Sequence, residues 1–263
     1  NDEKLIAPFP HFAKLATMAR ELLDESDRLA YVNDQFMIDL LVWYHLAWMG
    51  ESVRRSDIRI QAMMKKGKHF DFHDRRQLMT VIGELLDNLI PRYRRLAESG
   101  RVELSVTPYA HPIVPLLLDI NSASEAMPDV GLPEITSYPG GEERAHWHMD
   151  EGLRVFESFF GFKPKGCWPS EGAVSADTLK LVGQHGFKWA ATGENVLRNS
   201  LNKSDMADAN IHKPYKLIEE GPACFFRDDG LSDLIGFNYT TWSAEDAVSD
   251  FINHLTTIKV ETE

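Results

Sequence analysis

The sequence pattern changes after residue 100, and this change restricts the folds that the chain can adopt. From there on, short apolar runs typical of strands alternate with longer segments that have helical periodicity. The strand candidates are 101–108, 164–168, 187–191, 223–226 and 234–239, and the clearest helix candidates are 142–161, 175–185 and 243–258. Strands that alternate with helices predict a parallel sheet or barrel, with the active site at the carboxyl ends of the strands.

The first hundred residues instead have the pattern of helices. Apolar side chains recur at steps of three and four between residues 74 and 98, Gly100 follows as a C-terminal cap, and Pro91 is expected to kink or split this helix. Segment 36–48 is apolar nearly all round, which predicts a buried or interface helix. We therefore predict a mainly helical part or insertion over 1–100 and a catalytic barrel portion over 101–263, within one domain overall.

Charge and composition exclude several classes of protein. The formal net charge is −12, so a phosphate backbone would be repelled and nucleic acid is not the expected partner. No apolar run approaches the roughly 20 residues that a membrane span needs. Two cysteines cannot make a disulfide framework, and no His/Cys spacing indicates a zinc site, so we predict a cytoplasmic protein without metal or cofactor.

Polar and aromatic side chains follow each strand candidate. In chain order they are Thr107, Pro108, Tyr109 and His111, then Trp168, Ser170 and Glu171, then Thr192 and Glu194, then Arg227, Asp228 and Asp229, and finally Tyr239 and Trp242. Aromatic rings can stack on the apolar face of a sugar, while carboxylates and arginine bind its hydroxyls and supply acid and nucleophile. This mixture at one rim predicts a carbohydrate site.

Each of these residues also has a purely structural interpretation. Glu171 lies just before a predicted helix, where an acid is favoured by the helix dipole, and Trp168 fits a core position. Asp228 fits a turn in "RDDG". His146 and His148 are two residues apart on a predicted helix, so they point to different faces and make a poor metal pair. Only the convergence of the residues after the strand candidates on one rim favours a carbohydrate site.

Four segments in order resemble glycoside hydrolase family 57: "VELSVTPYAHPIVPLLLD", "GFKPKGCWPSEGAVS", "FKWAATGENVL" and "FRDDGLSDLIGF". Members are retaining enzymes that act on α-glucans, including amylases, amylopullulanases, glucanotransferases and branching enzymes. The resemblance implies an α/β fold, an incomplete (β/α)7 barrel with helical insertions. It also implies that Glu171, the acid of the "WPSEG" segment, is the nucleophile. We expect substrate contacts from His111, Trp168, Arg227, Trp242, Glu103, Glu194, Asp228 and Tyr109.

The chain also departs from the family pattern. The general acid is implied to be an Asp in an Asp-Gly-Glu stretch, which this sequence lacks, and a first motif with His-Gln-Pro is also missing. Gly193 stands where relatives usually have Asp, and Asp229 where a His is common. The sequence starts at Asn1 without a Met, so we expect a piece truncated at both ends, weakly active or inactive alone; a divergent homologue that has lost hydrolysis is the alternative.

Two other functions compete with this reading. A metal-dependent polysaccharide deacetylase would need an Asp/His/His cluster, for which His111, His146 and Asp119 are the candidates. A non-catalytic glucan-binding module would keep the aromatic side chains and tolerate loss of the acid. The sequence leaves linkage preference and oligomeric state open. It also leaves open whether water or a sugar acceptor reaches the glycosyl-enzyme, and thus whether the reaction is hydrolysis or transglycosylation.

Overall fold

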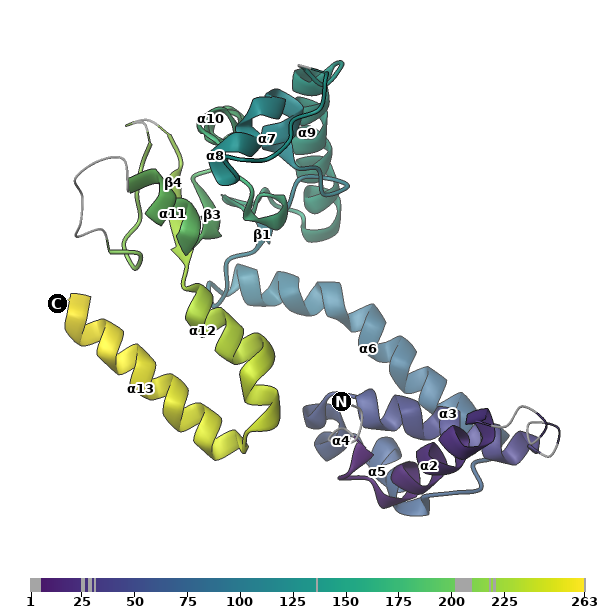
Figure 1. Cartoon of the computed structure of the whole chain (residues 1–263). Helices are drawn as coiled ribbons and strands as arrows, with labels where there is room; N and C mark the ends of the chain where they lie inside the picture. The colour runs from purple at the N-terminus through teal and green to yellow at the C-terminus, as the bar shows by residue number, and fades with distance from the viewer. Residues whose placement is uncertain are drawn as a thin grey trace. The chain divides into compact units, whose positions relative to one another are not determined.

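A computed structural model of the chain describes residues 6–24, 27, 30, 32–135, 137–201, 210–217, 219 and 221–262. The chain divides into two compact units, Asn1–Arg92 and Tyr93–Glu263 (Figure 1). The division falls inside one long helix, α6 (Phe72–Glu98).

The first unit is helical, as its sequence pattern predicts. It contains α2 (Pro10–Asp24), α3 (Asp34–Trp48), α4 (Glu51–Ser56), α5 (Ile58–Lys66) and most of α6. Side-chain caps define two of the helix starts: the Asn33 side chain accepts a hydrogen bond from the backbone N–H of Phe36, and Asp57 caps α5 in the same way. Such caps satisfy backbone donors that have no partner inside the helix.

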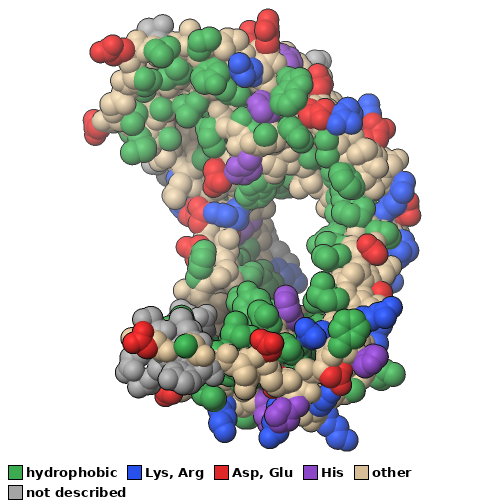
Figure 2. Space-filling view, turned by 90° about the vertical axis from the view of Figure 1, so that its right-hand side faces the viewer, with side chains coloured by type: hydrophobic (Ala, Val, Ile, Leu, Met, Phe, Trp, Pro, Cys, Tyr) green, Lys and Arg blue, Asp and Glu red, His purple; other side chains and the backbone are tan. Residues whose placement is uncertain are grey.

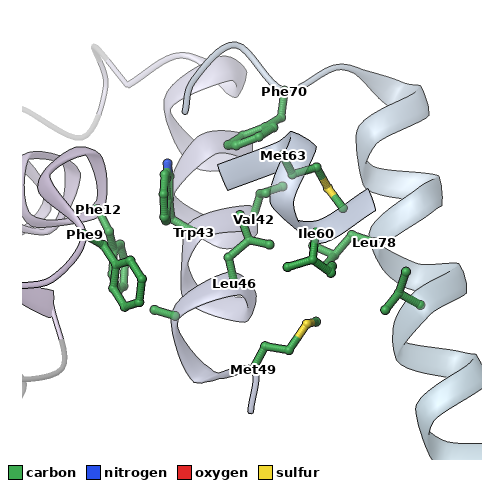
Figure 3. Close-up of a cluster of buried hydrophobic side chains, with 12 residues drawn as sticks. Phe9, Phe12, Val42, Trp43, Leu46, Met49, Ile60, Met63, Phe70 and Leu78 are labelled. Atoms are coloured by element: carbon green, nitrogen blue, oxygen red, sulfur yellow. The ribbon is translucent and has the colours of Figure 1, made fainter. Parts of the chain in front are cut away.

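The core of the first unit is built on one face of α3. Val42, Trp43 and Leu46 on this face are buried together with Ile60 and Met63 of α5 (Figure 3). The other members of the cluster are Phe9, Phe12, Ala47, Met49, Phe70, Leu78 and Val81. Leu41, Tyr44 and Trp48 of α3 are exposed, so the all-round apolar pattern of segment 36–48 corresponds to a helix that is buried on one face.

Helix α6 confirms the helix predicted over 74–98 and corrects one detail. Pro91 lies inside the helix without splitting it. A single proline removes one backbone hydrogen bond, and the other bonds of this 27-residue helix keep it continuous. Gly100 has the left-handed φ of +72° expected of a residue that ends a helix.

The second unit contains a four-stranded parallel sheet in the order β1-β2-β3-β4. The strands are β1 (Ser105–Val106), β2 (Gly166–Cys167), β3 (Trp189–Gly193) and β4 (Ala223–Arg227). Helices α7 (Val114–Leu118), α9 (Gly141–Phe160), α10 (Ala176–Gln184) and α11 (Glu194–Leu201) lie between them in the sequence. The predicted α/β alternation and four of the five strand candidates are therefore confirmed.

The fifth strand candidate is wrong. Residues 234–239 form the π-helical turn η4 (Leu234–Asn238) and the start of the 3-10 turn η5 (Tyr239–Thr241), and both follow α12 (Asp229–Asp233). The Asp228 side chain accepts a hydrogen bond from Leu231 N–H and starts this helical run. A short apolar run is compatible with a buried helix as well as with a strand. Here the Asp228 cap favours the helical conformation. The chain continues into α13 (Ala244–Thr262).

The expected loop between residues 121 and 141 is also partly helical. It includes the end of η2 (Ile120–Ser122) and the short helix α8 (Ala123–Ala126). Among the described residues, no helix is long and apolar enough to span a membrane.

The core of the second unit lies between the sheet and its helices. It consists of Val114, Ala145, Met149, Cys167, Leu181, Val182, Phe187 and Ala190. α7 and α9 approach so closely that a Cβ added at Gly141 would lie 1.8 Å from the carbonyl oxygen of Leu117. The core therefore joins α7, α9 and α10 to the sheet. Because the strands are parallel, the loops that follow them lie at one edge.

Candidate active site

The carboxyl ends of the four parallel strands bring several predicted site residues to one edge of the sheet. His111 lies in the loop after β1, and Glu171 lies in η3 (Ser170–Gly172) after β2. Glu194 is the first residue of α11, and Arg227 is the last residue of β4. In open parallel sheets, ligands bind at this edge.

His111 and Glu171 contact one another. His111 Nε2 lies 3.7 Å from Glu171 Oε1, and the two side chains are 54% and 74% exposed. The strand ends that carry them are joined by a hydrogen bond of 2.9 Å from Trp168 N–H to the carbonyl oxygen of Val106. A carboxylate beside an imidazole, both open to solvent, can meet a ligand that reaches this edge.

The backbone at this contact has an uncommon conformation. Ala110, His111 and Glu171 have φ values of +55°, +58° and +56°, in the left-handed region that non-glycine residues rarely adopt. Among the described residues, His69 is the one other non-glycine residue with positive φ. Backbone strain of this kind concentrates at functional sites, where the surrounding structure holds it in place.

The end of β3 supports the turn that carries Glu171. Buried Thr192 donates a hydrogen bond from Oγ1 to the carbonyl oxygen of Gly172. Gly172 also has a left-handed φ of +68°, and a Cβ added there would lie 3.7 Å from the backbone nitrogen of Gly193. Adjacent strand ends therefore fix the position of Glu171 through its backbone.

A charged network joins the ends of β3 and β4. Arg227 Nε donates to Asp229 Oδ1 at 2.8 Å, and Asp229 N–H donates to Glu194 Oε2 at 3.1 Å. Arg198 completes it with a hydrogen bond to Glu194 Oε1. A Cβ at Gly193 would lie 3.3 Å from Asp229 Oδ2, so the Asp229 carboxylate uses the space that a side chain at position 193 would need. Asp229 was not among the predicted contacts, although the departures at 193 and 229 were a signal for it.

Tyr109 lies on the same loop as His111 and is fixed against α9. Its N–H donates to the carbonyl oxygen of His148 at 3.0 Å, and His148 Nδ1 donates to the Tyr109 carbonyl oxygen at 2.6 Å. The Tyr109 ring meets the ring of Trp147, a residue that sequence reasoning missed.

Other predicted contact residues have different surroundings. Trp168 is half-buried. Glu103 precedes β1, so it lies toward the opposite edge of the sheet, where it accepts a hydrogen bond from Trp189 Nε1. The Asp228 side chain caps α12. Trp242 does not follow a strand, because the expected fifth strand is helical, and its ring packs on Tyr239 with centroids 5.4 Å apart.

The residues considered for a metal site contact different partners. His111 faces Glu171, whereas His146 Nδ1 lies 3.4 Å from His185 Nε2 and Asp119 accepts hydrogen bonds from Asn121. His148 bonds the Tyr109 backbone, so the two histidines of α9 point to different neighbours as expected. In the described part of the chain, no group of three or more His, Cys, Asp or Glu side chains could hold a metal ion.

Comparison with solved structures finds six similar chains, among them an α-amylase and two branching enzymes. The α-amylase AmyC from Thermotoga maritima has 13% identity and a TM-score of 0.43, and the match covers 86% of this chain and 33% of that one. The branching enzyme of the family 57 type from Pyrococcus horikoshii has 17% identity and a TM-score of 0.42, with 76% of this chain and 34% of that one covered. The family 57 branching enzyme from Thermococcus kodakaraensis has 17% identity and a TM-score of 0.43, with 74% of this chain and 35% of that one covered. The last was solved in complex with glucose and additives. This chain thus spans about a third of the length of these enzymes.

A comparison with curated protein sequences finds no match. The sequence profile of one family, described as glycosyl hydrolase family 57, matches residues 16–263, which is nearly the whole chain. The chain therefore belongs to glycosyl hydrolase family 57.

Proposed function

We propose that this chain forms part of a retaining enzyme that acts on α-glucans through a glycosyl-enzyme on Glu171. The observation that carries the proposal is the contact between Glu171 and His111, held by left-handed backbone at the ends of two adjacent strands. Membership in the family gives the class of reaction, and the similar solved chains are an α-amylase and branching enzymes. Starch, glycogen and maltooligosaccharides are the substrates that we propose.

In the first step, a Glu171 carboxylate oxygen attacks the anomeric carbon. A bond forms between that oxygen and the carbon while the glycosidic bond breaks, and the leaving oxygen takes up a proton. Water or a sugar hydroxyl then attacks the same carbon and releases Glu171. His111 Nε2 lies 3.7 Å from Glu171 Oε1, where it can orient the carboxylate.

The proton for the leaving group needs a second carboxyl group, about 5–5.5 Å from the nucleophile in retaining enzymes. The Asp-Gly-Glu stretch implied for that acid is not in this sequence. We therefore propose that the chain by itself turns over natural glucans weakly. A glucosyl donor whose leaving group departs without a proton should still react at Glu171.

The difference between natural glucans and donors that need no protonation of the leaving group gives a direct test. An α-glucosyl fluoride with a second fluorine at C5 needs no protonation of its leaving group, and its glycosyl-enzyme breaks down slowly. We expect intact-protein mass spectrometry to find one added fluoroglucosyl group, and peptide mapping to place it on Glu171. Glu171→Gln should abolish labelling, whereas Glu157→Gln, an exposed acid on α9, should leave it unchanged.

Labelling that persists in Glu171→Gln would exclude Glu171 as the nucleophile. Maltooligosaccharide binding without any labelling of the unmodified chain would instead favour the non-catalytic glucan-binding module. Both buried cysteines are free thiols, which fits the reducing cytoplasm that we propose as the location.

A further inference from the structure

An exposed pair of aromatic rings includes Tyr109, a residue of the loop that also carries His111. The rings of Tyr109 and Trp147 have centroids 5.6 Å apart and planes at 87° to each other, and the two residues are 41% and 53% exposed. Exposed hydrophobic side chains are common on the face shown in Figure 2, so exposure alone does not single out this pair. Three other features distinguish this pair: its backbone hydrogen bonds, its position near His111 in the sequence, and the charged side chains on the same helix.

The first distinguishing feature is rigidity. Two hydrogen bonds join the Tyr109 backbone to His148, the residue after Trp147, so the backbones that carry the two rings are fixed relative to one another. One turn further along α9, a Cβ at Gly152 would lie 3.3 Å from Tyr109 N and 3.5 Å from the carbonyl oxygen of Thr107. The loop therefore lies directly on the helix, and a ligand that stacks on these rings has little ordering of the protein to overcome.

The second feature is continuity with the candidate active site. Tyr109 lies two residues before His111 on the same loop, and His111 contacts Glu171. The short stretch between them includes the strained residue Ala110, so the loop geometry that presents His111 also presents the Tyr109 ring. A sugar chain with one unit at Glu171 would extend toward the aromatic pair.

The third feature is a pair of charged side chains on the helix that carries Trp147. Glu151, one turn after Trp147 on α9, accepts two hydrogen bonds of 2.6 Å from Arg154. This hydrogen bonding and the Glu151 charge raise the pKa of Arg154, and the phenol of Tyr109 is a smaller electrostatic cause that acts in the same direction. The Arg154 side chain is 66% exposed, so its guanidinium is open to solvent on the helix that carries Trp147.

From this arrangement we infer that Trp147 and Tyr109 form a glucosyl-binding subsite for an α-glucan chain, next to Glu171. The inference rests on the proposed function and adds two features of the substrate: its length and its curvature. Successive units of an α-1,4-glucan turn relative to one another, which suits two ring planes near a right angle. A flat β-1,4-glucan would need coplanar rings.

The test measures binding calorimetrically on the full 263-residue chain with Glu171→Gln to prevent turnover. We expect Trp147→Ala to weaken maltoheptaose binding about tenfold and maltotriose binding much less, because the shorter chain occupies fewer subsites. Trp147→Phe should restore most of the affinity by keeping a ring. Cellohexaose should bind more weakly than maltoheptaose and be insensitive to Trp147→Ala.

Trp48→Ala is the matched control. Trp48 is also an exposed tryptophan on a helix with a tyrosine ring beside it, Tyr44 at 6.1 Å, but it belongs to the other unit. This variant should bind maltoheptaose like its parent. A heteronuclear NMR titration of the Trp147 indole N–H in the chain without Trp147 substitutions provides a second measurement that does not depend on the folding of Trp147→Ala.

Equal maltoheptaose affinity with and without Trp147, or no maltoheptaose binding by the parent, would overturn the subsite. Either result leaves the proposed function standing if Glu171 is labelled by the fluorinated donor. Conversely, binding that depends on Trp147 in a chain that is never labelled would support the subsite and contradict the nucleophile.

Discussion

The position of Glu171 is set mainly by its backbone. Its side chain is 74% exposed and contacts His111, whereas the turn around it is fixed by hydrogen bonds from Gly172 N–H to Pro169 O and from Ala173 N–H to Ser170 O. Each left-handed non-glycine residue costs roughly 1–3 kcal/mol, which the rest of the fold must supply. A carboxylate presented in this way can move as a side chain while its Cα stays fixed.

The two cysteines behave differently from this exposed acid. Burial raises the pKa of Cys167 to about 12 and that of Cys224 to about 11. Thiolates are the reactive form, so we expect neither thiol to be alkylated by iodoacetamide at pH 8 in the native protein, and both to react in urea. Mass spectrometry after timed quenching measures this, and rapid modification of the native chain would show that the sheet opens easily.

The sheet register also predicts that these thiols do not form a disulfide. Cys167 and Cys224 pair with opposite sides of Ala190, which places them two strands apart. Two strand spacings are about 9.5 Å, beyond the Cα separation that a disulfide can bridge. A mild oxidant should therefore leave the native chain without an internal disulfide.

The positions of the candidate site residues in the fold were predictable to different degrees. The sequence indicates where His111 and Glu171 lie because each follows an apolar strand. It does not indicate their left-handed backbone conformation, because neither residue is glycine. Trp147 was missed because its polar neighbours in the sequence look like a solvent-facing helix. Its contact with Tyr109 exists only once α9 packs on the loop after β1.

At the level of elements, the fold class was predictable. Membership in family 57 and the open parallel sheet confirm the predicted α/β class, an incomplete (β/α)7 barrel with helical insertions. Four strands were found because each is an apolar run between turn residues. The fifth failed because the Asp228 cap turns an equally apolar run into a helix, a local choice that hydrophobicity does not show.

The contact between α7 and α9 leaves no room for one added methyl group. A Cβ at Gly141 would overlap the Leu117 carbonyl oxygen at 1.8 Å, and backbone atoms cannot move aside cheaply. We expect Gly141→Ala to lower the free energy of unfolding of the second unit by about 1–3 kcal/mol. Urea unfolding monitored by circular dichroism measures this.

Gly83→Ala is the matched control for this substitution. Gly83 lies inside α6 with nothing within 4 Å of an added Cβ, so alanine should stabilise the helix by about 0.5–1 kcal/mol. Equal effects of the two substitutions would mean that α7 and α9 are not packed as described.

At the level of the whole molecule, the described residues form two hydrophobic cores with no residue in common. One gathers side chains from α2, α3, α5 and α6, and the other gathers side chains from α7, α9, α10 and the sheet. Burial of apolar surface is the main source of folding free energy, and a compact unit with its own core can in principle fold alone. Separate cores therefore predict separate local stabilities.

Hydrogen exchange can test this separation with one core substitution in each unit. Leu46 is fully buried in the first core, so Leu46→Ala should lower the stability of that unit by about 2–5 kcal/mol. Amides of α2, α3 and α5 should then exchange faster, while those around Val182 keep their wild-type rates. Val182→Ala should give the reverse pattern.

Helix α6 makes the outcome informative, because its residues belong to both units. If the units unfold independently, faster exchange caused by Leu46→Ala should fade along α6 near Arg92, where the first unit ends. Acceleration that continues through β1 to β4 would show that the two cores unfold as one cooperative body. In that case a substitution in the helical unit would also loosen the strand ends that carry His111 and Glu171, and it would reduce labelling of Glu171 by the fluorinated donor.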